Sequence, residues 1–209
     1  MKRNLALGAL MLAACTEPAA PARTSTYAFD VGGDVFRWPS DRLPVRYYAD
    51  TRGNMGFLIG RALSIWEDQF LYGEFRGIVV SDSTTADVIV RWADSVPPDV
   101  PPDAGPPVAA CDGVTTLFFD SAGTALAQPV RAQIRITTGQ AFTAAQVAAC
   151  LRRVTIHELG HTLGILQESP GPTDIMNTAA PVSLPSGRDR QTVEVLYHTP
   201  PTIGPPPPR

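Results

Sequence analysis

The stretch from His157 to His161 constrains this chain most, because it places two histidines and a glutamate within five residues. On an α-helix, residues four apart are separated by about 400° of rotation, so they lie on one face about one turn apart. His157 and His161 can then direct imidazole nitrogens at one ion, at the distance of about 2.0–2.1 Å that Zn²⁺ requires. Glu158 is rotated by about 100° and lies beside that ion. There it can act as a base for a water whose pKa the metal lowers to about 7. The spacing predicts a helix that carries a zinc-dependent hydrolytic site.

The flanking residues support a helix at this place. Thr143 followed by Gln146 is a capping-box signature, which predicts where the helix begins. Gly164 can end the helix in a left-handed conformation. The alternative is two histidines on a helical surface without a metal. The chain has three histidines in all, and two of them fall in this spacing, which favours the metal interpretation.

Hydrophobic patterns elsewhere predict a chain of mixed strands and helices. Apolar residues recur at intervals of three and four between residues 54 and 72, which indicates an amphipathic helix, and Gly73 is its expected stop. A second short helix is expected at 189–198. Runs dense in β-branched and aromatic residues predict five strands, at 42–50, 77–82, 86–94, 114–120 and 130–138.

Prolines cluster in two segments that we expect to lie outside the packed core. Residues 97–107 contain six prolines in eleven positions, which excludes a central strand or a helix and predicts an extended, solvated loop. We interpret this loop as a spacer. The proline-rich tail at 199–209 is expected to be disordered or extended. The main domain is therefore expected to cover residues 31–198.

The first fourteen residues are expected to be a signal peptide of a bacterial lipoprotein. Two basic residues precede the apolar stretch 5–14, which is too short to span a bilayer. The stretch ends in Leu-Ala-Ala-Cys, which resembles the lipoprotein cleavage box with Cys15 as the acylated residue. Residues 15–30 are small and polar, as in a tether. We expect an exported protein anchored by lipid to the cell envelope, on the periplasmic or cell-surface side. The alternative is an ordinary secretory signal with an incidental Cys15.

The remaining cysteines and the charge bear on the compartment and the partners. If Cys15 is lipidated, Cys111 and Cys150 form an even pair in an oxidising compartment, and a disulfide between them is expected. The alternative is two buried free thiols.

The formal charge of −3 and the absence of a basic run argue against a nucleic-acid partner. We expect a monomer.

Three motifs together resemble one family of enzymes. They are HELGHTLG at 157–164, DIMN at 174–177 and RDRQTVEVLYH at 188–198. These segments resemble the metzincin zinc metallopeptidases and, within them, the matrixins. The likeness extends over roughly residues 36–198. It implies that Met176 belongs to the family's Met-turn, where it forms a hydrophobic floor beneath the metal and is not a ligand.

The resemblance also implies a fold and a way of binding substrate. The expected α/β fold has a twisted, mostly parallel five-stranded sheet with one antiparallel edge strand. A backing helix and an active-site helix pack on this sheet, and a small C-terminal subdomain holds the Met-turn and a final helix. A protein or peptide substrate would bind as an extended strand along the edge strand, next to one catalytic Zn²⁺.

The third metal ligand departs from the family pattern. The family places a third histidine six residues after the second, where this chain has Gln167. Matrixins commonly place the third histidine eight residues before the Met-turn methionine and directly before a serine. That spacing, counted back from Met176, gives Glu168, so the resemblance suggests a one-residue insertion. Carboxylate is a good zinc ligand, and His₂Glu sites are catalytic in other zinc peptidases. Gln167 or water in a weakened site, a remote ligand such as His198, or no metal remain alternatives.

Three functions are compatible with these residues. The first is an exported, membrane-anchored zinc endopeptidase in which Glu158 activates water. The second is a weakened or inactive relative that binds peptides in the inherited cleft, which the replaced third ligand favours. The third is a zinc hydrolase of a non-peptide substrate, for which only the generality of the histidine motif argues. Retention of Glu158 speaks against the second, because a pure binder has no need of a base.

Overall fold

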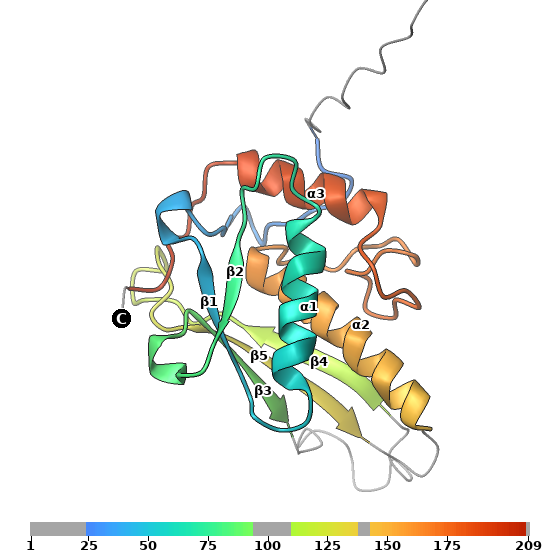
Figure 1. The fold of residues 1–209 in the computed structure, drawn as a ribbon. Helices are drawn as coiled ribbons and strands as arrows, with labels where there is room; N and C mark the ends of the chain where they lie inside the picture. The colour runs from blue at the N-terminus through green and yellow to red at the C-terminus, as the bar shows by residue number, and fades with distance from the viewer. Residues whose placement is uncertain (1–23, 94–109, 138–142, 208–209) are drawn as a thin grey trace, which may run out of the picture.

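The computed structural model describes residues 24–93, 110–137 and 143–207, which form one mixed sheet and its packed helices (Figure 1). The expected signal peptide (1–14) and the proline-rich loop (97–107) lie outside the described residues. Two short 3₁₀ helices cover Ser40–Arg42 and Ser83–Thr85. The longer elements are β1 (Val45–Ala49), α1 (Met55–Glu67), β2 (Gly77–Val80), β3 (Val88–Ala93), β4 (Ala110–Thr116), β5 (Val130–Thr137), α2 (Ala144–Leu163) and α3 (Gly187–His198).

The sheet has the strand order β2-β1-β3-β5-β4. β1 pairs in parallel with β2 and with β3, and β3 pairs in parallel with β5. β4 pairs antiparallel with β5 and is an edge strand. The predicted five-stranded, mostly parallel sheet with one antiparallel edge strand is therefore confirmed. The central strand β3 carries fully buried Val88 and Val90, whose side chains are two residues apart and point to the same face of the sheet.

Several predicted boundaries differ from the structure, and for the helix at 54–72 and the strand at 114–120 hydrogen bonds explain where the element ends. The helix expected at 54–72 ends at Glu67, because the amides of Gln69 and Phe70 donate to carbonyls three residues back and tighten the chain. Phe70 is nevertheless buried, so the apolar pattern continues past the helix. The strand expected at 114–120 is β4, which ends at Thr116. Beyond it, the chain pairs with residues 125–127 in a separate turn.

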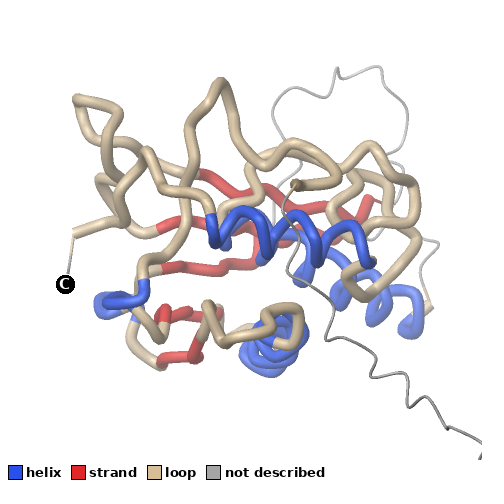
Figure 2. Tube along the Cα trace, turned by 90° about the horizontal axis from the view of Figure 1, so that it is seen from above, coloured by secondary structure: helices blue, strands red, loops and turns tan. Residues whose placement is uncertain are grey.

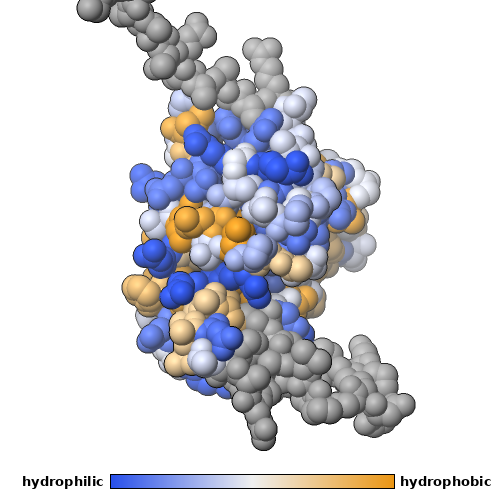
Figure 3. Space-filling model, turned by 90° about the vertical axis from the view of Figure 1, so that its right-hand side faces the viewer, coloured by the Kyte–Doolittle hydropathy of each residue, from blue (hydrophilic) through white to orange (hydrophobic). Residues whose placement is uncertain are grey.

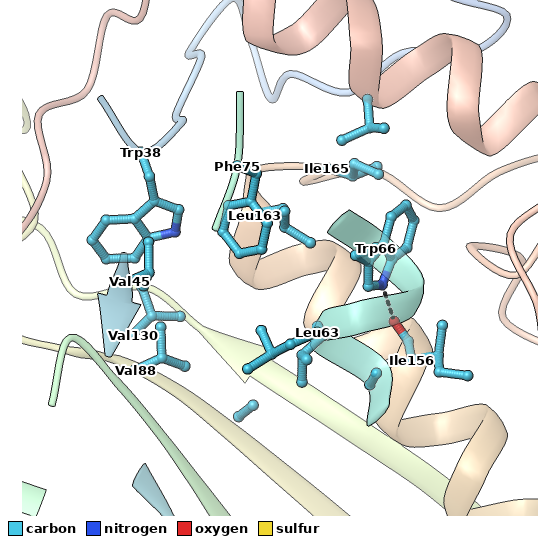
Figure 4. Packing of buried hydrophobic residues seen from close by; sticks show 14 of the residues in the cluster. Trp38, Val45, Leu63, Trp66, Phe75, Val88, Val130, Ile156, Leu163 and Ile165 are labelled. Carbon is cyan, nitrogen blue, oxygen red and sulfur yellow. Dashed lines mark hydrogen bonds between the residues drawn. The ribbon is translucent and has the colours of Figure 1, made fainter. Parts of the chain in front are cut away.

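Helices α1 and α2 cover one face of the sheet. α1 contacts β1 and β2, α2 contacts β4 and β5, and Figure 2 shows both helices on the same side of the strands. α3 crosses the end of the molecule at which α2 finishes (Figure 1). The two packed helices meet at Trp66, whose indole nitrogen donates a 2.8 Å hydrogen bond to the carbonyl oxygen of Ile156 (Figure 4). Leu63 and Leu163 lie beside this contact in the core.

Both ends of the described chain belong to the domain, which corrects two expectations. The predicted tether (15–30) is not loose over its described part, because Tyr27 and Phe29 are buried. The predicted tail (199–209) is also anchored, since Ile203 is buried and bridges Phe36 in parallel. Their apolar side chains fill the core, and the small and proline residues around them had suggested linkers.

The described surface gives no sign of a membrane span. Within the described residues, no helix is both long and apolar enough to cross a bilayer. On the face drawn in Figure 3, the apolar surface is divided into patches by hydrophilic residues. Exposed large apolar side chains such as Phe57 and Leu184 occur in different parts of the chain.

The two ends of α2 follow the predicted signals. Thr143 and Gln146 form the capping box at its start. Gly164 ends the helix with φ 113°, and its amide donates to His161 and Gly160 carbonyls. An added Cβ at Gly164 would overlap the carbonyl oxygen of Phe36. This turn therefore requires glycine for its conformation and also for close approach of the N-terminal segment.

Substituting Gly164→Ala is expected to destabilise the protein by more than a positive φ alone explains. Gly123 is the matched control, because it has φ 70° and no heavy atom within 4 Å of an added Cβ. Gly123→Ala should lower the free energy of unfolding by about 1–2 kcal/mol. Gly164→Ala should add roughly 1–3 kcal/mol of overpacking. Urea unfolding measures both, and equal losses in the two variants would contradict the close approach to Phe36.

Candidate metal centre

His157 and His161 are held in defined orientations by backbone carbonyls. The Nδ1 atom of His157 lies 2.7 Å from the carbonyl oxygen of Ile175, and that of His161 lies 2.6 Å from the carbonyl oxygen of Ile165. A carbonyl only accepts, so each Nδ1 carries a proton and donates. In the neutral imidazoles both Nε2 atoms then present lone pairs, and they lie 3.2 Å apart. Two facing lone pairs need a proton or a metal cation between them.

Glu168 completes a triangle with these nitrogens. Its Oε1 atom lies 3.5 Å from Nε2 of His157 and 3.3 Å from Nε2 of His161. Ligands about 2.0–2.1 Å from a tetrahedral Zn²⁺ are about 3.3 Å apart. The three separations fit three corners of such a tetrahedron, and the donors are the nitrogen and oxygen types that zinc takes. Among the described residues, this is the one group of three or more His, Cys, Asp and Glu side chains that could hold a metal.

The structure brings Glu168, and not Gln167, to the two imidazoles. Gln167 is not among the residues that line the cavity at this site, whereas Glu168 is. His198 lies elsewhere, with its Nε2 atom 3.6 Å from Oε1 of Glu74. The count back from Met176 therefore predicted the residue that meets His157 and His161. The alternatives that used Gln167 or His198 disagree with this geometry.

Neighbouring charges affect the protonation of these ligands. Burial raises the pKa of Glu168, but hydrogen bonds donated by Nε2 of His157 and His161 when these imidazoles are protonated outweigh it and hold that pKa at about 2. Glu168 is therefore an anion at neutral pH, which is the ligand form of a carboxyl group. Burial lowers the pKa of His157, but Glu168, the Ile175 carbonyl and Glu158 raise it above its usual value. The pocket thus favours positive charge at the imidazole of His157.

Glu158 is buried against the edge strand. It is 2% exposed, and its Oε2 accepts a 2.7 Å hydrogen bond from the hydroxyl of Thr115 on β4. An added Cβ at Gly113 would overlap the carboxylate, so glycine is required there. Burial raises the pKa of Glu158 above its usual value, and His161 and Thr115 oppose that rise. Sequence reasoning missed Gly113 and Thr115, although a glycine inside a strand often marks such a close approach.

Met176 lies directly under α2. An added Cβ at Gly160 would overlap its sulfur and would come within 2.9 Å of Trp66. Met176 is fully buried, and its carbonyl accepts a 2.8 Å hydrogen bond from the amide of Ser169. The residue predicted as a hydrophobic floor therefore packs on the helix that carries both histidines. This close packing of Met176 on α2 depends on the absence of a side chain at Gly160.

Two buried aspartates fix the loop that carries Met176. Asp189 accepts hydrogen bonds from the amide of Ile175 at 2.8 Å and from the hydroxyl of Tyr27 at 2.8 Å. Asp174 accepts from Ser169 and from Ser186, the latter at 2.7 Å. Sequence reasoning did not single out either aspartate. Ser186 and Asp189 do form the capping box of α3, and the Ser-x-x-Asp pattern was readable.

A cavity of about 320 Å³ opens beside the candidate metal centre. One wall is the edge strand β4, with Asp112, Gly113 and Thr115. The face of α2 that carries the histidines and the loop after Met176 also line it. The cavity therefore brings together the metal-ligand triangle, Glu158 and an exposed strand edge.

The disulfide expectation is supported at one cysteine. Cys150, in α2, is disulfide-bonded. Its predicted partner, Cys111, is described only by its backbone, which pairs with Ile136 in the β4–β5 ladder. The pairing of the two therefore remains a prediction. Cys15, the predicted lipidation site, lies outside the described residues.

Comparison with known proteins finds no match, either to a protein-family model or to a curated protein. The arrangement of residues around the cavity is therefore the basis on which the chemistry of this site has to be argued.

Replacing Tyr27 by Phe is expected to reduce stability, because it leaves Asp189 with one fewer donor in a buried position. Burial and Asp189 raise the pKa of Tyr27 well above its usual value, so the phenol keeps the proton that it donates. We expect a loss of roughly 1–3 kcal/mol in the free energy of unfolding. Tyr72→Phe is the control, since Tyr72 is 71% exposed and should change stability by less than about 0.5 kcal/mol. Both free energies are measured by urea unfolding. Equal values for Tyr27→Phe and Tyr72→Phe would contradict a stabilising hydrogen bond between Tyr27 and Asp189.

Proposed function

We propose that this protein is an exported zinc endopeptidase, similar in its site to the matrixin branch of the metzincins. The observation that carries the proposal is the convergence of His157, His161 and Glu168 beside the buried carboxylate of Glu158. Their mutual distances of 3.2–3.5 Å suit a tetrahedral zinc ion with one position left for water or substrate. Catalytic zinc sites are of this kind, with three protein ligands and an open position.

The side chains have distinct roles in this proposal. His157, His161 and Glu168 hold the ion. When bound, Zn²⁺ lowers the pKa of a coordinated water to about 7 and polarises the carbonyl of the scissile bond. Glu158 accepts the proton of the attacking water and delivers it to the leaving amine nitrogen. Its raised pKa brings the carboxyl group closer to neutral pH, which suits proton transfer in both directions.

The edge strand β4 supports a peptide as the substrate. β4 pairs with β5 along one side, and its Gly113 and Thr115 line the cavity along the other. An extended peptide can add to such an edge through main-chain hydrogen bonds. A peptide in this position lies between β4 and the histidines of α2. Its carbonyl groups then pass close to the proposed metal, and no special side chain is needed to bring them there.

The carboxylate ligand has a chemical consequence. A third histidine is neutral, whereas Glu168 adds one negative charge to the ligand set. This charge weakens the Lewis acidity of the ion, so catalysis is expected to be slower than in a three-histidine site. It is also the observation that favours the alternative function, a protein that binds peptides without cleaving them.

Anchoring to a membrane rests on the sequence of residues 1–15 alone. The apolar stretch and Cys15 favour an exported lipoprotein of the bacterial cell envelope, so the proposed substrate is a protein or peptide outside the cytoplasm.

The glutamate base is tested by Glu158→Gln, which keeps the shape of the side chain and removes its basicity. We expect the variant to bind one zinc per chain, as the unmodified protein does, and to cleave peptide libraries about 10²–10⁴-fold more slowly. Glu74→Gln is the matched control, because Glu74 pairs with His198 away from the cavity. Zinc content is measured by atomic absorption and cleavage by mass spectrometry. Full zinc occupancy without any cleavage by the unmodified protein would support the peptide-binding alternative.

The third ligand is tested by comparing Glu168→Ala with Gln167→Ala. Loss of a hydrogen bond that supports a ligand weakens metal binding by roughly 10–100-fold. Glu168→Ala removes a proposed ligand itself, so we expect it to weaken zinc binding by more than this. Gln167→Ala should leave the zinc dissociation constant unchanged. Competition with a chelator measures both constants. If Gln167→Ala weakens zinc binding and Glu168→Ala does not, Gln167 is the third ligand.

A further inference from the structure

Arg153 lines the cavity beside the candidate metal centre. It is four residues before His157 on α2, so both side chains lie on the same face of the helix. Arg153 lines the cavity together with Asn177, Thr178 and Ala180 from the loop after Met176. Its Nη1 atom donates a 3.0 Å hydrogen bond to the carbonyl oxygen of Ala180, which fixes the guanidinium against that loop.

The charge of Arg153 is not neutralised by a carboxylate. Some other arginines of the described chain form ion pairs with carboxylates, such as Arg46 with Asp87 and Arg188 with Asp174. Among the described residues, no carboxylate forms an ion pair with Arg153. A guanidinium has five N–H donors and stays charged at any physiological pH, so it retains donors for a ligand.

The other charges in the cavity are already engaged. Asp112 forms an ion pair with Arg135, and Glu158 accepts a hydrogen bond from Thr115. Glu168 faces the two imidazoles. Arg153 is the one arginine or lysine among the described residues that line the cavity, and it is partly buried, which strengthens its interaction with an anion.

We propose that Arg153 makes the enzyme select substrates with a carboxylate close to the cleaved bond. This inference rests on the proposed peptidase function. A carboxylate matches the forked geometry of the guanidinium and can accept two N–H bonds at once. Leu117 and Val154 also line the cavity and can contact the apolar stem of a glutamate side chain. The carboxylate belongs either to a Glu or Asp side chain or to the C-terminus of a short peptide.

The test uses peptides of one sequence in which the residues flanking the cleaved bond are Glu, Gln or Lys. Each peptide is made with a free and with an amidated C-terminus, which separates side-chain from terminal carboxylates. We expect kcat/KM for the amidated Glu peptide to exceed that for the Gln peptide about tenfold or more, as for a charged hydrogen bond. If peptides with a free C-terminus are cleaved faster than amidated peptides whatever the flanking residue, the recognised carboxylate is the C-terminus of the peptide. That result supports the same role for Arg153.

Variants connect the preference to this side chain. Arg153→Gln should abolish the preference for Glu over Gln, and Arg153→Glu should favour the Lys peptide. Arg152→Gln is the matched control, because Arg152 is exposed and lines a different depression with Leu58 and Ile156. Arg153→Lys keeps the positive charge and loses the forked donors, so it should retain a weaker preference for Glu over Gln. It provides the test if the other two variants do not fold. No preference in the unmodified protein, or one that survives Arg153→Gln, overturns the inference.

A binding measurement separates this inference from the proposed function. Fluorescence anisotropy of the labelled Glu and Gln peptides is recorded with the Glu158→Gln variant, in which turnover is not required. Tighter binding of the Glu peptide that disappears in the double variant with Arg153→Gln supports the inference even if no peptide is cleaved. Cleavage without any difference in binding or in kcat/KM leaves the peptidase intact and refutes the role of Arg153.

Discussion

The site depends on two hydrogen bonds from imidazoles to backbone carbonyls. Nδ1 of His157 donates to Ile175, and Nδ1 of His161 donates to Ile165. Because both donors are used in this way, both Nε2 atoms face the same point with their lone pairs. The same bonds tie α2 to the loop at residues 165–175, which carries Glu168. A single pair of contacts thus selects the tautomers, orients the rings and sets the third corner of the ligand triangle.

Close packing around α2 keeps that geometry rigid. Gly160, which lies between the two histidines in the sequence, lets Met176 pack against the helix. Gly113 lets the Glu158 carboxylate pack against β4. In both places a methyl group would occupy space that a functional side chain already fills. Small residues at these positions are therefore part of the site, although they have no chemistry of their own.

Buried aspartates connect the site to the ends of the chain. Asp189 on α3 binds the amide of Ile175 and the hydroxyl of Tyr27, so one carboxylate joins the final helix, the Met176 loop and the N-terminal segment. The proline-rich C-terminal segment packs near Phe36, whose carbonyl lies against the turn at Gly164. Segments that look like linkers by composition are consequently structural supports of the candidate metal centre.

The sequence by itself determined the parts that depend on local spacing. It predicted the helix from Thr143 to Gly164, the shared face of His157 and His161, and the five strands, because caps and periodicity act within a few residues. The matrixin spacing, counted back from Met176, also predicted that Glu168 is near the histidines. Only the tertiary structure decided that Gly113 admits Glu158, that Asp189 supports the Met176 loop, and that Arg153 faces the cavity without a carboxylate partner. Those features join elements that are far apart in the chain, and their geometry exists only once the helices pack on the sheet.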